Sequence, residues 1–97
     1  MNMIRKLRIG MAQINTTVGD FDKNTQKIIT AIKDAQALGV DLLSFPELAV
    51  CGYPPEDLLF KPKFIEQNAK SLRQIIDQTA GIAVIIGFVD IQLSPYI

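Results

Sequence analysis

Residues 40 to 60 read VDLLSFPELAVCGYPPEDLLF, a strand-like segment followed at once by turn-forming residues. Residues 40 to 45 are mostly apolar and have the length of a buried strand. Pro46 ends this strand because a proline nitrogen carries no hydrogen to donate to a neighbouring strand. The pattern therefore predicts that Glu47 lies at the C-terminal end of a strand, where the loops of an α/β protein carry its functional groups.

Upstream of this stretch the sequence predicts a strand and a helix. Residues 7 to 14, LRIGMAQI, form an apolar run of strand length that ends at the turn-forming residues NTTVGD. In residues 21 to 38 apolar side chains recur on one side of a helix, with the lysines largely on the other side. Asp20 or Asp22 can cap the start of this helix, and Gly39 can take the left-handed conformation that ends it.

From residue 56 onward the sequence predicts two more helices and a strand. Glu56 and Asp57 suit the N-terminus of a short helix, whose dipole favours acidic residues there. Pro62 suits the first turn of a longer amphipathic helix that runs toward Gly81. Residues 82 to 89, IAVIIGFV, are apolar on both alternations, as is typical of a strand covered on both faces. The order strand, helix, strand, helix, strand predicts an α/β fold.

Composition narrows the classes of function. Ten basic residues balance ten acidic ones, so no net charge attracts the chain to nucleic acid or to a membrane. No apolar run approaches the roughly 18 residues of a membrane span. A single cysteine cannot form an internal disulfide, and we expect a soluble, cytoplasmic protein. The chain has no histidine and no acidic cluster spaced for a metal, so we expect no metal site.

Glu47 is the first candidate for chemistry. Without histidine, a general base must be another side chain, and a carboxylate beside bulky neighbours at a strand end can serve. The alternative is a solvated acid in a loop. Gln13 and Asn15 end the first strand and either face the same site or satisfy turn backbone.

Four motifs give the sequence a resemblance to the carbon–nitrogen hydrolase, or nitrilase, superfamily over roughly residues 7 to 90. These motifs are AQIN, VGDFDKN, GVDLLSFPELAVCGYPPEDLL and VIIGFVD. The resemblance implies a nitrilase-like α-β-β-α sandwich, of which residues 1–97 would form the N-terminal, incomplete part of one domain. GYPPEDLL is similar in particular to the glutamine-dependent NAD synthetases. In that group such a domain hydrolyses glutamine, and the ammonia passes to a C-terminal domain that amidates deamido-NAD.

The resemblance also implies a Glu-Lys-Cys mechanism. The glutamate of the family's PEL motif falls on Glu47, which would act as general base and acid. The family's lysine and cysteine nucleophile lie further along and do not fall on this chain, so we expect the 97 residues alone to be inactive. Tyr53, beside this glutamate, either lines the substrate pocket or packs beneath the loop.

Several residues near Glu47 are expected to have structural roles. Cys51 does not match the family nucleophile and is expected to be a small buried hydrophobe. Lys61 is not the family lysine and is expected to be solvated. Gly52 permits a backbone conformation closed to other residues, and Gly87, inside the last predicted strand, indicates close packing or a bulge.

For the complete synthetase the resemblance implies glutamine as substrate, ATP, magnesium and deamido-NAD as further ligands, and homo-oligomeric assembly. Gly10, Gly19 and Gly39 are too dispersed for a phosphate-binding loop, so we expect no cofactor in residues 1–97. Two alternatives stay open. One is another amidase of the superfamily, acting on a nitrile, an N-carbamoyl amino acid or another amide. The other is a non-catalytic, small α/β interaction module.

Overall fold

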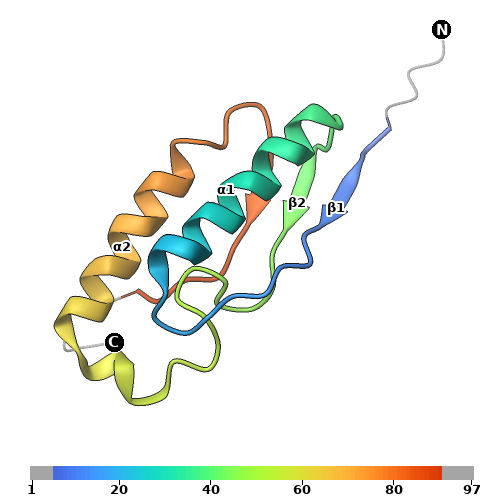
Figure 1. Cartoon of the computed structure of the whole chain (residues 1–97). Coiled ribbons are helices and arrows are strands. Elements are labelled where there is room, and N and C mark those ends of the chain that lie inside the picture. The colour runs from blue at the N-terminus through green and yellow to red at the C-terminus, as the bar shows by residue number, and fades with distance from the viewer. Residues whose placement is uncertain (1–5, 91–97) are drawn as a thin grey trace, which may run out of the picture.

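The computed structural model describes residues 6–90. The predicted order of strand, helix, strand, helix, strand is confirmed, and a short 3-10 helix, η1, stands where Glu56 and Asp57 were expected to begin one (Figure 1). In chain order the elements are β1 (Ile9–Met11), α1 (Phe21–Ala37), β2 (Leu42–Ser44), η1 (Glu56–Phe60), α2 (Pro62–Ile76) and β3 (Ala83–Ile85).

The three strands form one parallel sheet in the order β1-β2-β3. Because the strands run the same way, their C-terminal ends meet at one edge, which we call the C-terminal edge (Figure 1). Three loops leave the sheet there: residues 12–20, 45–55 and 86–90. Each strand is shorter than the apolar run that predicted it. The run extends beyond the residues whose backbone groups pair with a neighbouring strand. Pairing persists for one residue beyond β1, where the Ala12 N–H donates to the Ser44 carbonyl at 2.8 Å.

The helix boundaries follow local signals. The Asp20 side chain caps α1 by accepting from the Lys23 N–H at 3.3 Å, and Gly39 follows the helix with a φ of +71°. Pro62 occupies the first turn of α2, as predicted. This helix ends well before Gly81, because the Thr79 hydroxyl and N–H both donate to the Ile76 carbonyl and close a turn.

The two helices pack side by side, and the core lies between them and the sheet (Figure 1). The rings of Phe21 and Phe64 meet edge to face, with centroids 5.0 Å apart, and so join the two helices. The buried apolar residues come from both helices, β2 and the loop after it: Phe21, Ile28, Ile32, Ala35, Leu43, Ala49, Val50, Cys51, Phe64 and Ile75.

The other face of the sheet is open in the described part of the chain. Ile9, Met11 and Ile85 point to this face and are 59%, 75% and 58% exposed. We expected residues 82–89 to form a strand that is covered on both faces, and within the described residues this is wrong. The alternation of apolar side chains on both faces, which led to that expectation, is present. A sheet that is apolar on both faces and has helices on one is half of an α-β-β-α sandwich. None of the described helices is long and apolar enough to cross a membrane.

Candidate functional site

Glu47 lies on a turn at the C-terminal edge of the sheet, directly after the chain leaves β2. Pro46 ends the pairing, as predicted, and the Glu47 side chain is exposed. The next residue, Leu48, has a φ of +46°, a left-handed conformation that costs a residue with a side chain about 1–2 kcal/mol. The Gly52 N–H donates to the Leu48 carbonyl at 2.8 Å and closes the turn. Tertiary contacts must therefore hold this turn in place.

Two glycines let neighbouring loops press against the turn. Gly52 has a φ of +85°, and a Cβ added there would lie 2.6 Å from both the nitrogen and the Cα of Val18. The prediction that Gly52 adopts a conformation closed to other residues is confirmed. A Cβ added at Gly87 would lie 2.8 Å from the Leu48 nitrogen. Gly87 lies beyond β3 and not inside a strand, but the close packing that it indicated is present.

A fully buried asparagine on α1, Asn24, joins two of the edge loops. Its Nδ2 donates to the Thr17 carbonyl at 2.8 Å and to the Val50 carbonyl at 3.3 Å. Its Oδ1 accepts from the Thr17 N–H at 2.9 Å. The amide therefore ties the loop after β1 to the turn that carries Glu47.

Asn68 on α2, 1% exposed, makes the corresponding contacts with the third loop. Its Nδ2 donates to the Val89 carbonyl, and its Oδ1 accepts from the Val89 N–H at 3.3 Å. The sequence prediction overlooked both asparagines. The signal was present, because Asn24 and Asn68 each lie on the apolar side of a helix, at helical spacing from Phe21 and Phe64.

Cys51 is completely buried in the same turn, as predicted. Its Sγ lies 3.3 Å from the Gly52 carbonyl, within reach of a weak S–H hydrogen bond. Burial raises the pKa of the Cys51 thiol, and a backbone hydrogen bond opposes this rise in part. A buried thiol that keeps its proton is a poor nucleophile.

Tyr53 is 58% exposed, so the alternative in which it packs beneath the loop is wrong. Its role as a wall of the substrate pocket stays a prediction. Lys61 is exposed at the N-cap position of α2, and its expected solvation is confirmed.

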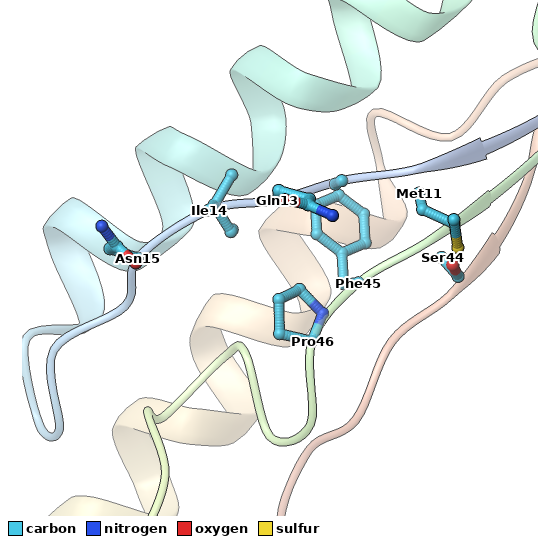
Figure 2. Close-up of a pocket in the computed structure, with 8 residues that line it drawn as sticks. Met11, Gln13, Ile14, Asn15, Ser44, Phe45 and Pro46 are labelled. Carbon is cyan, nitrogen blue, oxygen red and sulfur yellow. The ribbon is translucent and has the colours of Figure 1, made fainter.

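A cavity of about 620 Å³ opens where β1 and β2 end (Figure 2). Gln13 and Asn15 line it from the loop after β1, and Pro46 lines it from the loop after β2. Glu47 is the next residue after Pro46 but does not itself line the cavity. The remaining lining residues are Met11, Ala12, Ile14, Ser44 and Phe45.

The described residues contain no cluster of side chains that could bind the magnesium that the resemblance implies for the complete synthetase. Within residues 6–90 no three histidine, cysteine or acidic side chains are grouped so that they could hold a metal ion.

The strands of the parallel sheet are connected by helices, and an exposed carboxylate lies at the C-terminal edge. This is the layout of an α/β enzyme domain. The family model for carbon–nitrogen hydrolases matches residues 8–92. The chain belongs to the carbon–nitrogen hydrolase family.

Similar proteins narrow the relationship within this family. Over 95 residues, or 96% of this chain, it is 42% identical to a glutamine-dependent NAD(+) synthetase of Thermotoga maritima, of which it covers 16%. It is 48% identical over 82 residues to a synthetase of the same name from Synechocystis, covering 84% of this chain and 15% of that one. Among solved structures, the glutamine-dependent NAD+ synthetase of Acinetobacter baumannii in complex with ADP superposes with a TM-score of 0.82. That match is 36% identical and covers 90% of this chain and 16% of the other.

This chain thus spans about one sixth of the length of these relatives. The expected resemblance to the carbon–nitrogen hydrolases, and to the glutamine-dependent NAD synthetases in particular, is confirmed.

Proposed function

We propose that residues 1–97 are the N-terminal part of a glutaminase domain that hydrolyses the side-chain amide of glutamine and supplies ammonia for NAD synthesis. The observation that carries this proposal is the exposed carboxylate of Glu47 on a closed turn at the C-terminal edge. Support for the substrate comes from the relatives, whose names describe NAD synthetases that depend on glutamine.

In the proposed reaction Glu47 moves protons between the nucleophile, the leaving group and water. As general base it takes the proton of a cysteine thiol, and the thiolate attacks the amide carbon. A lysine stabilises the oxyanion, and Glu47 then gives its proton to the departing ammonia. Glu47 next takes a proton from water, whose oxygen attacks the thioester carbon, and then gives this proton to the departing cysteine sulfur, so that glutamate and the free thiol are released and Glu47 is a carboxylate again.

The nucleophile and the lysine of this mechanism come from outside residues 6–90. Cys51 is unsuited to the first role because it is buried and its pKa is raised. ATP, magnesium and deamido-NAD would bind elsewhere in the complete enzyme, and homo-oligomeric assembly and a cytoplasmic location stay predictions.

The test uses a chimera, in which this chain replaces the matching segment of the Thermotoga maritima relative. We expect the chimera to make NAD from glutamine. Glu47→Gln should lower kcat for glutamine hydrolysis by about 10²–10⁴-fold, because it removes the general base and keeps the size of the side chain. NAD synthesis from added ammonium should be unchanged, since added ammonium bypasses the amidase step.

Two results would contradict the proposal. The first is a Glu47→Gln chimera that hydrolyses glutamine as fast as the unsubstituted chimera. The second is faster hydrolysis of a nitrile or an N-carbamoyl amino acid than of glutamine, which would favour another amidase of the family.

A further inference from the structure

The turn that carries Glu47 is strained at Leu48 and is held through its backbone by neighbouring loops. Leu48 is left-handed, and the Gly52 N–H bond to its carbonyl is local to the turn. A turn held only by one local bond would relax toward a right-handed conformation, because this relieves the strain of a left-handed residue that has a side chain. Contacts from outside the turn must therefore fix the position of the Glu47 backbone.

Asn24 supplies such a contact on one side. Both hydrogens of its amide go to loop carbonyls, and one of them is the carbonyl of Val50, three residues after Glu47. The amide is fully buried, so breaking these bonds would leave polar groups without water. The rigid helix α1 thereby fixes one end of the turn.

Asn68 supplies the contact on the other side. Its two bonds to Val89 hold the loop after β3, and two residues earlier Gly87 meets the Leu48 nitrogen so closely that a Cβ would not fit. The loop after β3 therefore packs against the backbone of Leu48, the residue that follows Glu47, and limits its movement. Each helix thus contributes one buried amide, and the turn lies between the two loops that these amides hold.

We propose that Asn24 and Asn68 are positioning residues for Glu47, an inference that rests on the proposed function. They act through the backbone and touch neither the carboxylate nor the substrate. Their effect should be large because a displacement of about 1 Å in a catalytic group can lower a rate by about 10²-fold.

The first test is Asn24→Asp in the chimera. Aspartate has the same size and still accepts from the Thr17 N–H, but it places an oxygen opposite the carbonyls of Thr17 and Val50. We expect kcat for glutamine hydrolysis to fall at least tenfold and KM to change less than about threefold. Thr25→Val is the matched control, because Thr25 is the next residue of α1, is buried, and its hydroxyl has no hydrogen-bond partner among the described residues. It should leave kcat and KM unchanged.

A double substitution separates positioning from a general loss of structure. In a Glu47→Gln chimera, Asn24→Asp should lower the remaining rate by less than twofold, because no base is left to position. An equal loss in both backgrounds would overturn the proposal. So would a folded Asn24→Asp chimera with the kcat of Thr25→Val.

Asn68→Asp gives the same test from the other helix and keeps the bond from the Val89 N–H. It should also lower kcat without a matching change in KM, and it replaces Asn24→Asp if that variant does not fold. A glutaminase activity that survives Glu47→Gln would instead refute the proposed function itself. The two failures are therefore distinguishable.

Discussion

A methyl group added at Gly52 tests whether close contact between loops holds the turn that carries Glu47. In Gly52→Ala the new carbon would lie 2.6 Å from the Val18 backbone, where ordinary contacts begin at 3.4 Å, so the two loops must separate by about 0.8 Å. The left-handed φ of +85° costs about 1–2 kcal/mol for alanine, and the overlap adds about 1–3 kcal/mol. We expect the local stability of the turn to fall by about 2–5 kcal/mol.

The assay is amide hydrogen exchange of the chimera, followed at residues 19 and 52. Their N–H groups donate to the carbonyls of Cys51 and Leu48 and report on the contact between the loops and on the turn. Gly81→Ala is the matched control, because Gly81 has a φ of +73° but nothing within 4 Å of the added carbon. Exchange at residues 19 and 52 should be at least tenfold faster in Gly52→Ala than in Gly81→Ala, since tenfold corresponds to about 1.4 kcal/mol. Equal exchange in the two variants would refute the argument.

Three further predictions follow from the burial of Cys51 and the exposure of one sheet face. The Cys51 thiol is buried and its pKa is raised, so it should react with iodoacetamide at least about 10²-fold more slowly in the folded chimera than in urea at pH 8. Peptide mass spectrometry measures the two rates, and equal rates would contradict the prediction. In the unfolded chain this thiol loses its proton at a lower pH than in the folded chain. The free energy of unfolding should therefore fall as the pH rises above the ordinary thiol pKa. Urea titrations at several pH values should show that Cys51→Ala lacks this fall. The 97-residue chain alone should associate, because Met11 and Ile85 expose an apolar sheet face, and light scattering during a thermal melt should show less association for Met11→Lys with Ile85→Lys. A monodisperse, cooperatively melting chain would favour the independent module.

The sequence predicted the features that depend on a few neighbouring residues. Asp20 as one of two candidate caps, Pro62 in a first turn and Pro46 as the end of a strand are each set by local backbone chemistry. Glu47 follows Pro46 and lies on the turn just beyond β2, which ends at Ser44, close to the strand end where it was predicted.

Features set by distant parts of the chain were predicted less well. The length of each strand depends on how many of its backbone groups pair with the neighbouring strands. The apolar runs in the sequence do not reveal this number. The helical spacing of Asn24 and Asn68 placed them on apolar helix faces, but their role could not be predicted, because it depends on the distant loop carbonyls to which they donate. The exposure of Tyr53 depends in the same way on the tertiary course of its loop.

The parallel sheet also determines the order of events during synthesis. Ile9 pairs with Leu42, and Leu42 pairs with Ala83, so β1 must wait until α1 has been made, and β2 until α2 has been made, before the next strand of the sheet leaves the ribosome. At about 5–20 residues per second this interval lasts several seconds, far longer than a helix needs to form. During that time the first strand has no partner and its apolar side chains are accessible. The C-terminal edge, and with it the Glu47 turn, therefore cannot be complete until β3 has been made.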